Sequence, residues 1–301
     1  MVMNYYSPLR YPGGKAGLAF FLEQVIEFNG LHGCVYYEPF VGGGGAALKL
    51  LSNGIVSHVS LNDADPRIYA FWHAALNETS RFINRIFEVP LSLNEWHTQR
   101  DICYAPPSSN NIFEQGFSAF YMNRCNRSGI LKGAGPIGGR AQKSKWGLDA
   151  RFSREGLAER IHWLGKMRNH ISIQNEDGLQ FLKNNLPRGR GRNRVFTYLD
   201  PPYVGKGGHL YLNHFLQKDH TILAKYMNSQ NTLKWVMSYD DHELIHRLYQ
   251  DNCRIFPFSL QYSLQNRRRG AELLIAPQTT SLPGSIRCRG NEEPLMETIT
   301  S

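Results

Sequence analysis

The chain has 301 residues, 42% of them hydrophobic and 20% charged, which is the composition of an ordinary folded protein rather than a disordered or fibrous one. Its apolar stretches fall short of the ~20 residues that cross a membrane, and no apolar leader segment is visible. Lys and Arg (34) outnumber Asp and Glu (25), and the net charge of +9 favours a polyanionic partner.

The five cysteines are odd in number, scattered, and never spaced as CxxC. This pattern argues against a disulfide framework and against a zinc site, so no metal is expected. A reducing cytoplasm is the location that fits best.

Short strand-like and helix-like segments alternate in two parts of the chain. The apolar runs predicted as strands are 34–37, 56–61, 171–174, 195–199, 234–238, 254–258 and 272–276. Helices are predicted after the glycines at 42–45, from Asp177 onward, and over 219–228 and 240–249. Strands separated by helices predict an α/β fold with a mostly parallel sheet that is covered on both faces.

The middle of the chain breaks this alternation. It predicts helices over 67–77, 79–88 and 113–124, followed by a glycine-rich stretch in which 121–154 holds eight basic residues and one acid. We therefore expect a catalytic domain made of 1–65 and 171–280, with a mainly helical insertion over 66–170. Residues 281–301 lack a periodic apolar pattern and are predicted to be a flexible tail.

A turn of consecutive glycines at 42–45 links a predicted strand to a helix. Glycines let the backbone approach a ligand near a helix N-terminus. Asp63 follows the next strand, where a carboxylate can accept hydrogen bonds from two ribose hydroxyls. A glycine turn without a ligand and a nicotinamide or flavin enzyme are the alternatives at this point.

The tetrad Asp200, Pro201, Pro202 and Tyr203 directly follows the predicted strand 195–199. The Asp200 carboxylate and a proline carbonyl can accept both hydrogens of an exocyclic amine, which points the nitrogen lone pair at an electrophile. Tyr203 offers a flat face on which a base can stack. The tetrad therefore predicts chemistry on the amine of a base.

Two other segments carry weaker signals. RYPGGK at 10–15 is not a nucleotide-triphosphate loop, because Leu9 stands where the first glycine belongs and Ala16 replaces Ser or Thr. The basic middle stretch, with Trp146, predicts a surface that follows phosphates, although a solvated loop is the simpler alternative.

Taken together and in order, the segments RYPGGK, YEPFVGGGG, LNDADP, FYMNRCNRSG, LDPPY, KWVMSYD and RRRGAELLIA resemble the D12 class of Dam-like N6-adenine-specific DNA methyltransferases. The resemblance covers about 7–277. It implies a Rossmann-like sheet that uses S-adenosyl-L-methionine, with an inserted target-recognition domain for double-stranded DNA. It also implies base flipping, because an adenine inside a duplex cannot reach the methyl group.

The resemblance assigns roles residue by residue. The predicted catalytic residues are Asp200, Pro201, Pro202 and Tyr203, and the predicted cofactor-binding residues are Tyr11, Lys15, Glu38, Phe40, Gly42, Asp63, Asp177 and Asp200. The predicted DNA-binding residues are Arg124, Arg127, Lys132, Arg140, Lys143 and Lys145. Because 123–142 departs from the longer consensus of relatives that read GATC, that recognition sequence does not follow.

Three alternatives remain at this stage. N4-cytosine methylation uses the same amine chemistry, RNA adenine methylation needs only a different substrate surface, and a catalytically dead fold would still bind DNA. The absence of a Pro-Cys dipeptide argues against cytosine C5 chemistry, which needs a thiolate. A cognate restriction endonuclease, the oligomeric state and the biological role are left open.

Overall fold

The computed structural model of the chain describes residues 6–10, 15–106, 111–205, 215–260, 270–288 and 291–295. They divide into two compact units, Lys15–Asn62 with Glu176–Ser301, here called the sheet unit, and Met1–Gly14 with Asp63–Asn175, here called the helical unit. The sequence predicts 1–65 as part of the catalytic domain, whereas the described residues 6–10 belong to the helical unit.

A sheet of seven strands is present in the described residues, in the order β3-β2-β1-β4-β5-β7-β6. Its strands are β1 (Cys34–Glu38), β2 (Val56–Asn62), β3 (Ile171–Gln174), β4 (Val195–Leu199), β5 (Lys234–Asp240), β6 (Cys253–Leu260) and β7 (Gly270–Pro277). The pairs β1–β2, β1–β4 and β4–β5 are parallel, and β7 runs antiparallel to both β5 and β6. This arrangement confirms the predicted α/β fold with a mostly parallel sheet.

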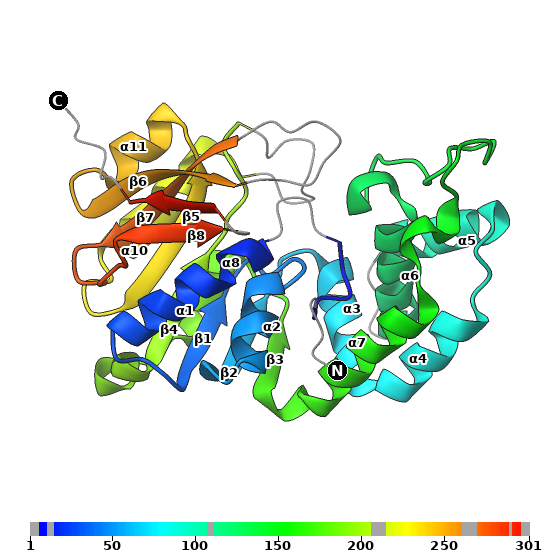
Figure 1. Ribbon diagram of the computed structural model, residues 1–301, viewed down its shortest axis with the longest axis horizontal. Helices are drawn as coiled ribbons and strands as arrows, with labels where there is room; N and C mark the ends of the chain where they lie inside the picture. Colours follow the sequence, from blue (N-terminus) through cyan, green and yellow to red (C-terminus); the bar gives the residue numbers. More distant parts are fainter. Residues whose placement is uncertain are drawn as a thin grey trace. The chain divides into compact units, whose positions relative to one another are not determined.

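Strand β4 is buried along its whole length, as expected of a central parallel strand covered on both faces. One face packs against helices α8 (Gly178–Asn185), α10 (Gln217–Asn228) and α11 (Glu243–Tyr249), which contribute side chains such as Phe181, Leu223 and Tyr249 to one core. In Figure 1, α1 (Ala19–Phe28) and α2 (Gly45–Ser52) lie in front of the strands. These two layers place the ends of β1, β4 and β5 between helices.

The helical unit is built mainly from α3 (Pro66–Asn77), α4 (Thr79–Glu88), α5 (Leu93–Tyr104), α6 (Ile112–Cys125) and α7 (Arg154–Lys166). Helices α3 and α6 pack closely, because a Cβ at Gly116 would lie 2.2 Å from the Ala70 carbonyl oxygen. Around this contact Phe71 stacks on Phe120 and Phe82 meets it edge-on, with ring centroids 6.0 and 5.2 Å apart. The aromatic core makes this unit a packed domain rather than a chain of loose helices.

The segment predicted as a flexible tail contains structure that its sequence did not indicate. Strands β8 (Ser285–Cys288) and β9 (Asn291–Pro294) pair antiparallel, and Ile286 is buried. Upstream, the Asn29 side chain at the end of α1 donates to the Ser281 carbonyl and accepts from the Ser281 N–H. The described part of 281–295 is therefore attached to the sheet unit. Within the described parts of the chain, every helix is too short or too polar to span a bilayer.

Candidate functional site

Polar side chains gather where neighbouring parallel strands end. Glu38 is the last residue of β1, Asp200 directly follows β4, and Asp240 is the last residue of β5. The strand order β1-β4-β5 brings these carboxyl ends to one edge of the sheet, the edge at which α/β folds bind their ligands. Glu272 joins them because β7 is antiparallel and pairs Glu272 with Asp240.

A buried ammonium lies at the centre of this edge. The Lys15 Nζ donates to the Tyr203 hydroxyl at 2.6 Å and to Glu272 Oε2 at 2.9 Å, and it lies 3.4 Å from Asp200 Oδ1. The side chains of Lys15 and Glu272 are only 4% and 2% exposed, so their charges are paired inside the protein. These four residues, Lys15, Asp200, Tyr203 and Glu272, are called the Lys15 cluster below.

The two oxygens of Asp200 have different surroundings. Oδ1 accepts from the Ser238 hydroxyl at 2.8 Å and from the Tyr203 hydroxyl at 3.3 Å, besides facing Lys15. Among the described residues, Oδ2 receives no hydrogen bond, and the side chain is 21% exposed. One oxygen is thus fixed by the protein, and the other can accept a hydrogen from a ligand.

Ser238 is itself oriented by a further hydroxyl. Its Oγ lies 2.7 Å from the Tyr198 hydroxyl, and because the Ser238 proton is used on Asp200, Tyr198 must be the donor. Both residues are fully buried on β5 and β4. The carboxylate is therefore held by a hydrogen-bond chain that comes from the rigid sheet.

Burial and neighbouring charges both shift the pKa values of the groups at this edge. Desolvation raises the pKa of Asp200, the Lys15 ammonium lowers it, and the Glu272 carboxylate raises it. Burial, Glu38 and Asp200 together raise the pKa of the Tyr36 hydroxyl well above its usual value. Among the described residues, the carboxylates of Glu38, Asp200 and Glu272 and the ammonium of Lys15 lie at this edge, a set that suits a ligand that carries a cation.

Asp240 fixes the loop that follows the DPPY tetrad. Its two carboxylate oxygens accept from the backbone N–H groups of Val204 at 3.0 Å and Gly205 at 2.7 Å. Pro201 and Pro202 are buried, and Tyr203 is half-buried with its ring 6.2 Å from that of Tyr239. Lys15 therefore contacts both Asp200 and Tyr203 of the tetrad, and Asp240 holds the backbone that directly follows it.

The glycine turn lies between β1 and α2. Gly42 and Gly44 have φ of +46° and +60°, a region that side chains other than glycine rarely adopt, and both are buried. Phe40 packs on the start of α8 so closely that a Cβ at Gly178 would lie 2.4 Å from its ring. Asp177 caps α8 by accepting from the N–H groups of Leu179 and Gln180, which gives it a structural role at the start of this helix.

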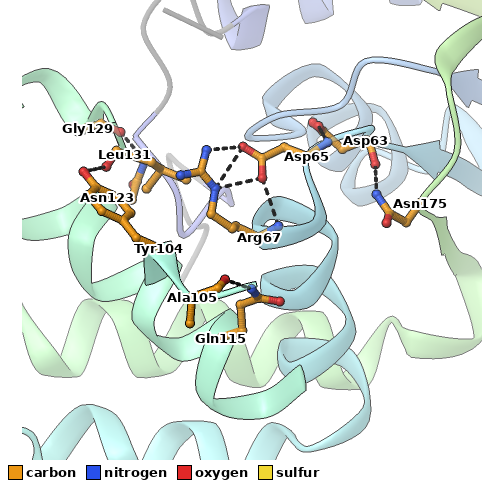
Figure 2. A network of polar contacts seen from close by, with 10 residues as sticks. All are labelled: Asp63, Asp65, Arg67, Tyr104, Ala105, Gln115, Asn123, Gly129, Leu131 and Asn175. Atoms are coloured by element: carbon orange, nitrogen blue, oxygen red, sulfur yellow. Dashed lines mark hydrogen bonds and ion pairs between the residues drawn. The ribbon is translucent and has the colours of Figure 1, made fainter. Parts of the chain in front are cut away.

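Asp63 opens a polar network in the helical unit (Figure 2). Its Oδ1 accepts from the Asp65 N–H at 2.9 Å, and its carbonyl accepts from the Asn175 side chain at 2.7 Å. Asp65 in turn caps α3 and forms a two-oxygen ion pair with Arg67. The network fixes the Asp63 backbone, and the Asp63 side chain is half-buried.

The end of α6, within FYMNRCNRSG, anchors the N-terminal segment. The Asn123 side chain accepts from the Arg10 N–H and donates to the Arg10 carbonyl, both at 2.7 Å, and also donates to the Gly129 carbonyl at 2.9 Å. Figure 2 shows the Gly129 contact. The Arg124 guanidinium donates to the Pro8 carbonyl and is buried. Its burial removes Arg124 from the candidate DNA-binding set.

The other predicted DNA-binding residues lie between α6 and α7 and are exposed: Arg127, Lys132, Arg140, Lys143 and Lys145. They are called the basic surface below. The Gln142 side chain donates to the Ile137 and Gly139 carbonyls and orders this glycine-rich loop. Trp146 is 63% exposed, with the Lys145 ammonium 5.6 Å from its ring.

The structure thus brings together Lys15, Asp200 and Tyr203, and it places Glu38 at the end of the adjacent strand β1. Tyr11 lies outside the described residues. Sequence reasoning assigned no role to Ser238, Asp240 or Glu272, although the quoted segments KWVMSYD and RRRGAELLIA contain them. The available signal was a polar residue within a largely apolar strand, as for Ser238 and Glu272, or at its end, as for Asp240.

Comparison with known proteins agrees with this geometry. A search among curated proteins gave no match. The sequence model of the D12 class N6 adenine-specific DNA methyltransferase family matches residues 11–264 and so spans both units. The chain therefore belongs to the D12 class N6 adenine-specific DNA methyltransferases and is an adenine-specific DNA methyltransferase enzyme.

Proposed function

We propose that the chain transfers the methyl group of S-adenosyl-L-methionine to N6 of an adenine that is flipped out of double-stranded DNA. The observation that supports this most directly is the state of Asp200. Its Oδ1 is occupied by Ser238, Tyr203 and Lys15, while Oδ2 is available to accept a hydrogen from an amine. Such an arrangement orients an amine without needing a covalent nucleophile.

The residues of the site fit a cationic methyl donor. One ammonium, Lys15, is paired with two carboxylates, Asp200 and Glu272, and Glu38 adds a third buried carboxylate nearby. A sulfonium and an α-amino group are both cations that this excess of negative charge favours. When bound, S-adenosyl-L-methionine supplies an activated methyl group. The glycine turn, Glu38 and Phe40 would hold it, together with Lys15, Tyr11, Asp63 and Asp177.

The protein then contributes position and polarisation. Asp200 Oδ2 accepts one hydrogen of N6, and a carbonyl of Pro201 or Pro202 accepts the other, so that the nitrogen lone pair faces the methyl carbon. A bond forms from N6 to that carbon as the carbon–sulfur bond breaks, and its electron pair stays on sulfur. N6 would be left cationic, and its proton would pass to Asp200 Oδ2 and from there to solvent. Stacking on Tyr203 offsets part of the few kcal/mol that base flipping costs.

The basic surface supplies the contact with the duplex in this proposal. Its five cations are exposed on an ordered loop, and Trp146 stands among them. Contacts between lysine or arginine and phosphate carry most of the sequence-independent affinity for DNA. This surface would therefore bind the backbone, while the sheet unit performs the transfer.

The test is transfer of a tritiated methyl group to duplex DNA that lacks N6-methyladenine, followed by nucleoside analysis. We expect the label on N6-methyladenine, and more of it with duplex than with single-stranded DNA or RNA. Label on N4-methylcytosine or on cytosine C5 would contradict the proposal. Equilibrium dialysis with the cofactor tests the dead-fold alternative, because such a protein need not bind it.

A further inference from the structure

Glu272 is a buried acid that the transfer reaction described above does not use. It lies on β7, its side chain is 2% exposed, and its Oε2 accepts from the Lys15 Nζ at 2.9 Å. Burying an unpaired carboxylate lowers the stability of the folded state. A leucine at this position of the strand would avoid that loss. The contact of Glu272 with the Lys15 ammonium is the feature that offsets the cost.

The position of Lys15 depends on what holds its ammonium. The side chain has four flexible carbons and begins in the short 3-10 turn Lys15–Leu18, next to α1. Nζ lies closer to Glu272 Oε2 (2.9 Å) than to Asp200 Oδ1 (3.4 Å). Glu272 is fixed by the register of β7, where it pairs with both Asp240 and Phe258. A rigid strand therefore determines where a flexible cation comes to rest.

Without that anchor, Asp200 would be the nearest carboxylate left for the ammonium. Lys15 could then move onto both oxygens of Asp200, and Oδ2 would no longer be available to a substrate amine. Resting on the proposed function, we propose that Glu272 is a positioning residue, which holds the Lys15 ammonium against Tyr203 and beside Asp200 Oδ1 so that Oδ2 stays open for the adenine amine.

The charge of Glu272 has a second, separable effect. Glu272 raises the pKa of Asp200 and Lys15 lowers it. The titratable groups that face or influence Asp200 from the surrounding elements are Lys15, Glu272, Tyr203, Tyr198, Tyr36, Glu38, Tyr239 and Asp240. Replacing the Glu272 carboxylate by a neutral amide removes a repulsive charge, so Asp200 should stay ionised to a lower pH.

Two substitutions separate position from charge. Glu272→Gln keeps an acceptor for Lys15 and removes the charge, whereas Glu272→Ala removes both. Glu243→Gln is the charge-matched control, because Glu243 is 83% exposed. Leu273→Val is the packing control, because Leu273 is buried in the core on the opposite face of the same strand.

The measurement is single-turnover methyl transfer to duplex DNA as a function of pH, together with the melting temperature of each variant. We expect Glu272→Ala to lower the transfer rate about 10–100-fold, the usual effect of misplacing a group by about 1 Å. Glu272→Gln should retain most of the rate at neutral pH and shift the acid limb of the profile to lower pH. The two controls should leave both the rate and the acid limb as in the wild type.

A wild-type rate in folded Glu272→Ala would overturn the proposal, and so would an acid limb in Glu272→Gln that coincides with that of the wild type. A merely structural role would lower the melting temperature without moving the acid limb, which is the result expected of Leu273→Val. Failure of the proposed function is distinguishable, because the wild-type protein itself would then place no label on adenine N6.

Discussion

The Lys15 cluster and the basic surface are both rich in charge, but the protein treats their charges in opposite ways. In the cluster, Lys15 and Glu272 are almost fully buried and joined by short contacts. On the basic surface, Lys143 and Lys145 are exposed, and neither forms an ion pair with any described residue. Fixed charges in a poorly solvated site orient reacting groups, whereas solvated cations bind a polyanion through released counterions. The comparison predicts that one region controls the reaction rate and the other controls affinity.

Asp200 should show the largest effect. Asp200→Ala removes both the fixed oxygen and the one that faces a ligand, so methyl transfer should fall by at least about 10²–10³-fold. Asp200→Asn keeps the shape but presents a donor where an acceptor is needed, and it should be severely impaired as well. Tritium incorporation measures the loss, and duplex binding should be unchanged. Activity near that of the wild type in Asp200→Ala would end the role assigned to this carboxylate.

The double substitution Lys143→Ala with Lys145→Ala should affect affinity instead. Each lysine that contacts a phosphate adds about one unit to the slope of log K against log salt, so the slope should become about two units shallower. Fluorescence anisotropy across a salt series measures the slope, and the affinity for the cofactor should not change. A slope equal to that of the wild type would move the DNA-binding surface elsewhere, with the exposed run Arg188–Arg194 as the next candidate.

Asp63→Ala tests the carboxylate that we propose binds the cofactor's ribose and that lies in the helical unit. Losing a charge-assisted hydrogen bond to a ribose hydroxyl should weaken the binding of S-adenosyl-L-methionine by about 1–3 kcal/mol. Isothermal titration calorimetry on the folded variant gives this number. Because Asp63 also accepts from the Asp65 N–H, Asp63→Asn is the control that keeps that acceptor. An unchanged affinity in Asp63→Ala would remove the residue from the site.

Arg124 tests whether burial separates structural from DNA-binding cations. It is close to the basic surface in the sequence, but its side chain is buried. Burial lowers the pKa of Arg124 to about 9, and its guanidinium donates to the Pro8 carbonyl. Arg124→Ala should therefore destabilise the fold by about 1–3 kcal/mol, the cost of leaving a buried acceptor unsatisfied. Urea unfolding measures this change. The salt slope of DNA binding should match that of the wild type, and a shallower slope would return Arg124 to the DNA-binding set.

The sequence predicted most of the sheet, because its strands are short apolar runs between recognisable turns. It also predicted that Asp200 follows a buried strand, since DPPY and the strand are contiguous. Ser238 and Glu272 could not be assigned in this way, because each is a single polar residue whose role depends on a contact with Asp200 or Lys15, which lie 38 and 257 residues away in the sequence. Arg124 shows the converse limit, since charge counting cannot tell a buried face of α6 from an exposed one.

The prediction of a flexible tail over 281–301 was wrong for the described strands β8 and β9, for a related reason. A two-stranded hairpin needs few apolar residues, and among the described side chains of this one Ile286 of β8 is buried. The sequence also could not predict that residues 6–10 belong to the helical unit. Their placement depends on side chains of α6 that contact backbone groups more than a hundred residues away in the sequence.

The most direct test of the division between rate and affinity is single-turnover methyl transfer at saturating DNA and cofactor, with Asp200→Asn and the Lys143, Lys145 double variant measured side by side. Saturation removes the contribution of affinity, so the lysine variant should recover the rate of the wild type while Asp200→Asn stays slow by at least about 10²-fold. A lysine variant that stays slow at saturation, or an Asp200→Asn protein that becomes fast, would contradict the account.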